Sequence, residues 1–114
     1  MANSSGEVFI LKTSDRAKSI PALLNKLGLQ DYSGKQVALK ANFNSADPFP
    51  ASTHLDTLRA VVETLRNVGT NDLTLAERSG MGETEQVLYQ MGVLALSREL
   101  GFKAVVLNDL GKED

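Results

Sequence analysis

A lysine and two asparagines stand at alternate positions after a short apolar segment. They are Lys40, Asn42 and Asn44. Alternate side chains of an extended chain point to the same side, so these three share a face if the strand geometry continues through them. A cation beside two amides can bind an anion or a carbonyl group. The structural alternative is that Lys40 extends into solvent and the asparagines bond the loop backbone.

A stiff turn and the start of a helix follow this motif. The turn spans residues 47–50 and contains two prolines, each of which restricts the backbone. Ser52 or Thr53 is suited to cap the next helix, whose free N–H groups attract anions. His54, the single histidine, lies in the first turn, where the helix dipole favours a neutral imidazole that can act as a base. A solvated surface histidine is the simpler alternative.

A second polar segment begins where another predicted strand ends. Glu77 is a candidate base or metal ligand, and Arg78 is a candidate clamp for an anion. Three further residues form a loop that can either cradle a phosphate or serve as a flexible turn: Ser79, Gly80 and Gly82. The loop is not the dinucleotide-binding fingerprint, because Glu85 occupies the position of its third glycine.

The positions of these residues also indicate candidates for catalysis and for metal binding. Lys40, His54 and Glu77 are the catalytic candidates, although their spacing identifies no reaction. The acids expected near one rim are weak candidates for a magnesium site: Asp47, Glu77 and Asp109. We expect no metal or cofactor. The absence of cysteine excludes thiolate zinc sites, cysteine nucleophiles and cysteine-held iron–sulfur clusters.

Strand-like and helix-like segments alternate along the chain. Strands are predicted over 7–12, 36–41, 72–77 and 102–107, and helices over 19–27, 55–68 and 83–100, the last interrupted at Gly92. This order predicts a three-layer, Rossmann-like α/β sandwich with a mostly parallel four-stranded sheet and helices on both faces. We favour the strand order 2-1-3-4, with 3-2-1-4 as the alternative. Ligands of such sheets bind at the carboxyl ends of the strands, where the polar residues above would meet.

Length and composition limit the classes of function. The 114 residues predict one α/β domain over 1–114, with 1–6 disordered and with the chain as the possible N-terminal portion of a longer domain. The net charge of −2 and the scattered basic residues argue against nucleic acid as a partner. The chain shows neither a membrane-spanning apolar run nor a secretory signal, so we expect no membrane partner and a cytoplasmic location.

The order of these motifs resembles the domain of unknown function 362 family. The matching residues are Lys40, Asn42, Glu77, Gly80 and Gly82. The resemblance extends over about Val8 to Asp109 and implies membership of an uncharacterised family whose members are typically longer. Many members carry ferredoxin-like, cysteine-rich segments for iron–sulfur clusters. This chain departs from that pattern because it has no cysteine, and Ala41 replaces the proline often found in the lysine motif.

Two functions remain open, and whether the protein is an enzyme is uncertain. The first is binding of an anionic small molecule, such as a carboxylate, phosphate or nucleotide, at the carboxyl rim of the sheet. Its ligand-binding candidates are Lys40, Asn42, Asn44, Ser52, Thr53, Arg78, Ser79, Gly80 and Gly82. The alternative is a non-catalytic interaction or structural module. Such a module would be completed by self-association as a homo-oligomer, by a missing downstream domain or by a redox partner domain.

Overall fold

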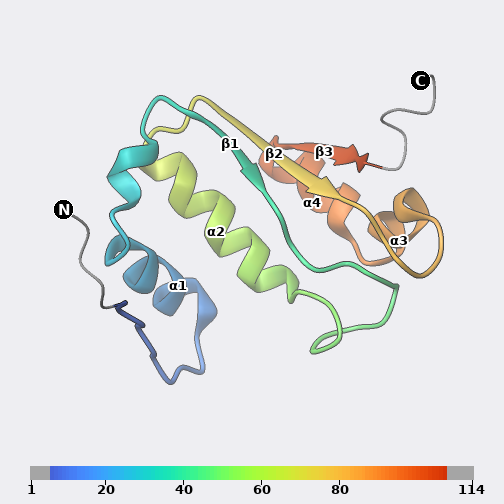
Figure 1. The fold of residues 1–114 in the computed structure, drawn as a ribbon, viewed down its shortest axis with the longest axis horizontal. Coiled ribbons are helices and arrows are strands. Elements are labelled where there is room, and N and C mark those ends of the chain that lie inside the picture. Colours follow the sequence, from blue (N-terminus) through green and yellow to red (C-terminus); the bar gives the residue numbers. More distant parts are fainter. Residues whose placement is uncertain (1–5, 108–114) are drawn as a thin grey trace.

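Residues 6–107 are described by a computed structural model, which has an α/β fold (Figure 1). The elements in chain order are α1 (Arg16–Asn25), the 3-10 turn η1 (Leu29–Tyr32), β1 (Gln36–Leu39), α2 (Leu55–Asn67), β2 (Asp72–Glu77), α3 (Thr84–Gln90), α4 (Val93–Leu100) and β3 (Lys103–Val106). Residue Asp109 and the segment 1–5 lie outside the described residues, and with them most of the expected disordered start.

The three strands form a parallel sheet of order β1-β2-β3. Val37 of β1 pairs with Leu73 of β2, and Leu75 of β2 pairs with Ala104 of β3. Both predicted strand orders are therefore wrong. In those orders the segment 7–12 is strand 1, so β1, β2 and β3 correspond to strands 2, 3 and 4. The order 2-1-3-4 would place the segment 7–12 between β1 and β2, and the order 3-2-1-4 would separate β2 from β3. Both of these pairs are instead hydrogen-bonded directly.

The expected first strand, residues 7–12, forms no strand and pairs with none in the described part of the chain. Its residues Val8 and Phe9 lie beside α1 and line an apolar hollow with Ile20 and Leu23. The Lys26 ammonium lies 5.7 Å from the centre of the Phe9 ring. The prediction of a strand here was wrong, because β-branched composition favours a strand only where a neighbour accepts its backbone bonds.

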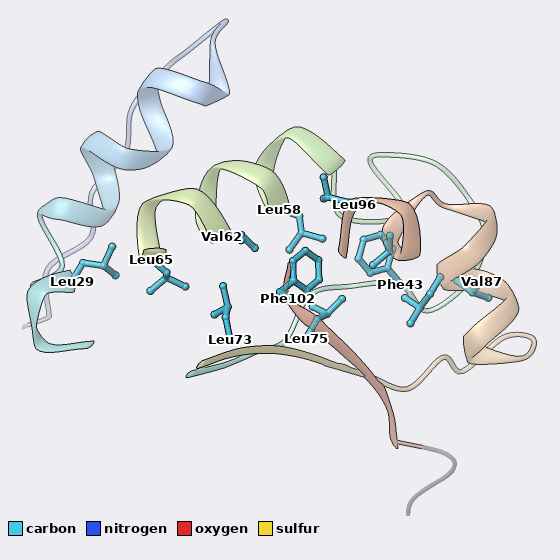
Figure 2. Close-up of a cluster of buried hydrophobic side chains, with 12 residues drawn as sticks. Leu29, Phe43, Leu58, Val62, Leu65, Leu73, Leu75, Val87, Leu96 and Phe102 are labelled. Atoms are coloured by element: carbon cyan, nitrogen blue, oxygen red, sulfur yellow. The ribbon is translucent and has the colours of Figure 1, made fainter. Parts of the chain in front are cut away.

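The helices cover one face of the sheet (Figure 2). Leu73 and Leu75 point from β2 into a buried cluster that also receives side chains from α2, α3 and α4. α1 packs on α2 rather than directly on the sheet. No helix of residues 6–107 covers the opposite face, where Thr74 and Ala76 are half-buried, so the expected third layer is not present there.

Helix α2 carries the longest apolar stripe of the fold. Its buried residues include Leu58, Val62 and Leu65, which face the core as their helical spacing predicts. On the exposed side, Arg59 donates two hydrogen bonds to Glu99 of α4, of 2.6 and 3.0 Å. These bonds lower the pKa of Glu99 and raise the pKa of Arg59. The ion pair joins the two helices at their solvent-exposed edge.

Two predicted helix boundaries have different outcomes. Gly92 adopts φ +81° and separates α3 from α4, which confirms the predicted interruption. α1 begins at Arg16 instead of near Ser19, so Pro21 lies inside the helix rather than in its first turn. None of the helices described between residues 6 and 107 has the length and apolarity needed to cross a membrane.

Two adjacent residues of α3 provide a test of the buried cluster. Leu88 is fully buried, whereas Tyr89 is 65% exposed. We expect Leu88→Ala to lower the free energy of unfolding by about 2–5 kcal/mol, because it removes contacts and leaves a cavity. Tyr89→Ala should change it by about 0.5 kcal/mol or less. Urea denaturation measures both, and equal losses would contradict the position assigned to α3.

Candidate functional site

The Glu77 carboxylate joins the ends of two neighbouring strands. Its side chain is only 1% exposed, although it carries an ionisable group at the last position of β2. Oε1 accepts hydrogen bonds from Lys40 Nζ at 2.8 Å and from the Arg78 backbone N–H at 2.9 Å. Oε2 accepts one from the Phe43 backbone N–H at 3.2 Å. A buried carboxylate needs such donors, so Glu77 holds the segment after β1 against the end of β2.

Lys40 is the cation of this arrangement and remains largely open to solvent. Its side chain is 62% exposed, and its ammonium donates to Glu77 Oε1 and to the Ala41 carbonyl at 2.7 Å. An ammonium has three donors, so one is left for a ligand or water. Glu77 neutralises much of the charge of Lys40, which reduces the strength with which Lys40 alone attracts an anion.

The two asparagines of the motif hold different segments. β1 ends at Leu39, so the strand does not continue through the motif. Asn42 donates from its side-chain amide to the Ala51 carbonyl at 3.3 Å. Asn44 accepts from the Gly80 backbone N–H at 2.7 Å. Both amides thus bond loop backbone in this structure, which is the structural alternative raised by the sequence.

The glycine-bearing loop is anchored to the segment 42–44. Ser79 Oγ donates to the Phe43 carbonyl at 2.7 Å, and the Met81 N–H donates to the Asn44 carbonyl at 2.9 Å. The Ser79 N–H is bound by Thr84 Oγ1 at 2.9 Å. A Cβ atom at Gly80 would collide with Asn44 Oδ1, so the close approach requires glycine. Gly82 has φ +84°, as the turn interpretation expects, and most N–H groups of this loop already have acceptors.

The stiff turn is fastened to the same segment from the other side. Thr53 exchanges bonds with Asn42, because its N–H donates to the Asn42 carbonyl and its Oγ1 accepts from the Asn42 N–H, both at 2.9 Å. Buried Ser52 donates to the Asp47 carbonyl at 2.6 Å. The Asp47 carboxylate accepts from Ser45 Oγ at 2.8 Å. The Phe49–Pro50 peptide bond in this turn is cis.

His54, rather than Ser52 or Thr53, is the N-cap of α2. Its Nδ1 accepts the Asp56 backbone N–H at 3.0 Å. Nδ1 is then the unprotonated nitrogen, so Nε2 carries the hydrogen and acts as a donor. The ring also packs edge-on against Phe49, with centroids 5.3 Å apart, and Arg16 of α1 lies 5.0 Å from the centre of that Phe49 ring. In this arrangement the imidazole has a capping role and is not poised as a base.

Arg78 is the one rim candidate whose charged group has no partner in residues 6–107. Its side chain is exposed, and its guanidinium makes no hydrogen bond or ion pair within the described residues. Its backbone N–H and Lys40 Nζ bind the same Glu77 oxygen. The Arg78 backbone and the Lys40 ammonium are therefore neighbours at the carboxyl end of the sheet.

Metal ligands do not gather in the described part of the chain. No three histidine, aspartate or glutamate side chains between residues 6 and 107 come close enough to hold an ion together. Glu77 binds three N–H donors, and Asp47 accepts a hydrogen bond from Ser45. Asp109, the third acid proposed for magnesium, is outside the described residues.

The segment 40–54 and the loop 77–84 meet at one corner of the molecule. Sequence reasoning missed the residues whose backbone or hydroxyl groups hold this corner together. Phe43 is fully buried between two exposed asparagines, and its N–H and carbonyl bind Glu77 and Ser79. The alternation of one aromatic residue between two amides was the available signal for a buried anchor. Thr84, at the first position of α3, was not considered because its partner Ser79 is five residues away across a loop.

Comparison with known proteins places these residues in one family. Residues 37–113 match the model of the family described as Domain of unknown function (DUF362), which is more than half of the chain. The motif residues Lys40, Asn42, Glu77, Gly80 and Gly82 lie within this match, so the resemblance inferred from them is confirmed. The match begins after the segment 8–36, which the resemblance had included. Neither the curated proteins nor the solved structures contain a match to this chain.

The buried carboxylate can be tested by an isosteric substitution. We expect Glu77→Gln to lower the free energy of unfolding by about 1–3 kcal/mol, because an amide offers one acceptor oxygen where the carboxylate serves three donors. Lys40→Met should cost less, since water reaches the exposed position of its ammonium. Urea denaturation of the two variants compares them, and an unchanged Glu77→Gln protein would contradict the anchoring role of Glu77.

The histidine cap has a matched pair of variants. His54→Ala removes the acceptor for the Asp56 N–H and should lower stability by about 0.5–2 kcal/mol. His54→Asn supplies a short side-chain oxygen at the same position and should recover most of that loss. Thermal unfolding of the two variants and the parent protein in the same buffer measures both effects. Equal stability of the alanine and asparagine variants would show that the cap contributes nothing.

Proposed function

The chain belongs to the DUF362 family, and we propose that it binds an anionic small molecule at the carboxyl rim of its sheet. The observation that carries this proposal is the exposed Arg78 side chain, which has no partner within residues 6–107 and whose backbone N–H binds the same Glu77 oxygen as the Lys40 ammonium. The ligand class is a carboxylate, phosphate or nucleotide. The carboxyl rim is also where parallel α/β sheets generally bind their ligands.

Geometry supports a role for Glu77 in positioning rather than in contact with the ligand. The carboxylate is buried and holds Lys40 by a 2.8 Å bond, so the flexible lysine side chain has a defined position. A positioned ammonium loses less conformational freedom on binding than a free one. The remaining Lys40 donor and the planar Arg78 guanidinium would contact two oxygens of the anion.

The hydrogen bonds of the corner narrow the set of proposed contacts. Asn42, Ser52 and Thr53 bind loop backbone, and Asn44 binds the Gly80 N–H. These groups support the proposal as the scaffold that holds the loop 78–82 next to Lys40. The proposed direct contacts are therefore Lys40 and Arg78. Binding is proposed without a chemical reaction, because the acceptor nitrogen of His54 caps α2 and the buried Glu77 carboxylate already binds three donors.

A ligand screen on two matched arginine variants tests the proposal. Thermal unfolding is measured with inorganic phosphate, nucleotides, sugar phosphates and organic acids, and a ligand at about ten times its Kd should stabilise the protein by about 1.4 kcal/mol. Arg78→Gln should weaken the affinity roughly tenfold, the value of one charged hydrogen bond. Arg98→Gln is the control, since Arg98 is exposed on α4 and likewise makes no bond within residues 6–107.

Two results would contradict the proposal. The first is the absence of stabilisation by every probe at millimolar concentration. The second is equal loss of binding in the Arg78→Gln and Arg98→Gln variants, which would show a nonspecific charge effect. A difference confined to Arg78 would support a site at the rim.

A further inference from the structure

The outer edge of β1 has no strand partner within residues 6–107. β1 bonds to β2 along one side only, through the positions Gln36–Leu39. An apolar hollow, which we call the edge groove, lies between β1 and the helical segments α1, η1 and α2. Its lining includes Leu24, Leu27, Leu29, Tyr32, Val37 and Leu39. An edge with open backbone groups is a template for a further strand, and natural sheets usually cover it.

The segment 7–12 of the same chain borders this groove. Val8 and Phe9 line a second apolar hollow against α1. Two side chains, Leu24 and Leu27, line both hollows, so the two hollows meet at these leucines. Leu27 is 62% exposed and leaves their common wall open to solvent. The segment and the open edge are therefore neighbours within one chain.

The order of the elements selects the open side of β1 for a strand that precedes α1. The sheet runs β1-β2-β3 in one direction, and the helices that connect its strands lie on one face. Right-handed crossovers between successive neighbouring parallel strands produce this arrangement. α1 precedes β1 and packs against α2 (Figure 1). By the same rule, a parallel strand that leads into α1 lies on the side of β1 opposite to β2.

One register directs apolar side chains of the segment into the groove. In β1, Val37 and Leu39 pack against the core. A parallel strand with Phe9 beside Val37 and Leu11 beside Leu39 points both of its side chains to the same face, toward the helices. Phe9 is 36% exposed and Leu11 is 47% exposed while the segment is unpaired. Pairing in this register therefore covers apolar surface on both sides of the contact.

The same register sets the alternate side chains of the segment on the other face of the sheet. Val8 is 83% exposed and Ile10 is 90% exposed in the unpaired segment. Ile10 comes to lie beside Ala38, which is also exposed. No helix of residues 6–107 covers that face. Ile10 and Ala38 thus form an accessible pair of positions that report on the pairing.

The register also brings Lys12 beside Lys40 at the carboxyl rim. Lys12 is exposed and makes no ion pair within the described residues. Like charges directly opposite each other weaken the pairing of two strands. An anion held by Lys40 and Arg78 would offset this repulsion and gain a third cation. Binding of the anion and pairing of the strand are therefore expected to favour each other.

We propose that residues 7–12 are a strap that closes as a fourth strand on the β1 edge of its own chain when an anion binds at the rim. Lys12 then contacts the anion together with Lys40 and Arg78. This role of the anion rests on the proposed function, whereas the strap itself rests on the edge groove. Linkage requires that the anion favours closure by the same factor by which closure raises the affinity for the anion.

A pair of engineered cysteines measures closure. The chain has no native cysteine, so the introduced thiols are the only ones. In dilute solution, the Ile10→Cys/Ala38→Cys protein should form a disulfide within one chain on mild oxidation, because neighbouring strands bring the two positions within bonding distance. A non-reducing gel shows the bridged monomer. Ile10→Cys/Tyr89→Cys is the control, since Tyr89 is exposed on α3. Equal rates for the two pairs, or bridges only between chains, would overturn the closure.

Lysine variants of the Ile10→Cys/Ala38→Cys protein test the charge at the rim. Without an anion, Lys12→Gln should raise the rate of disulfide formation about two- to fivefold, because it removes the opposed charge. Lys18→Gln, at an exposed position of α1, is the control and should leave the rate unchanged. Inorganic phosphate should raise the rate in the parent pair and have a smaller effect in the Lys12→Gln variant. An equal response to phosphate in both would overturn the role of Lys12.

The anion site and the strap can fail separately. Phosphate that stabilises the protein through Arg78 without changing the rate of disulfide formation would overturn the strap and support the anion site. A disulfide rate that rises with Lys12→Gln, with no stabilisation by any anion, would overturn the anion site and its control of closure. Where phosphate binds, Lys12→Gln should weaken its affinity about fivefold, the value of one hydrogen bond.

Discussion

The bonds of the buried Glu77 carboxylate are the interaction on which the corner of this structure depends. One group at the end of β2 binds a side chain from the end of β1 and two backbone N–H groups. It thereby fixes the course of the chain after β1 and allows the Phe43 ring to enter the core. Ser79 then binds the Phe43 carbonyl, so the glycine-bearing loop depends on the same placement.

Most polar side chains near this corner form hydrogen bonds with the backbone of the loops. Asn42 and Thr53 join the chain after β1 to the start of α2, and Asn44 joins it to Gly80. A buried or loop-forming backbone needs such partners before any ligand is considered. Among the charged groups of this rim within residues 6–107, the Arg78 guanidinium and one donor of Lys40 have no partner, and these two groups support the proposal of an anionic ligand.

The sheet is covered by helices on one face and keeps two further surfaces available. The opposite face carries small half-buried residues, including Ala76 and Val105, and β1 borders an apolar hollow that is also lined by Leu24 of α1. The segment 7–12 has the composition of a strand, but it has no partner strand within residues 6–107 and exposes apolar side chains. The failed prediction of a first strand follows from one physical condition, which is that the backbone groups of a strand require a partner strand.

Local patterns in the sequence were sufficient for elements whose stability depends on near neighbours. The stripe of Leu58, Val62 and Leu65 predicted α2, and Gly92 predicted the break between α3 and α4, because helical spacing and positive φ are local properties. The family was also recognisable from Lys40 and Glu77 with their neighbours.

Tertiary structure alone decided the pairing of the strands and the direction of the site residues. The Lys40 ammonium is held by a carboxylate 37 residues farther along the chain. Pairing of residues 7–12 depends on which edge the chain can reach. Both are long-range contacts, and neither leaves a periodic or compositional signal in the sequence.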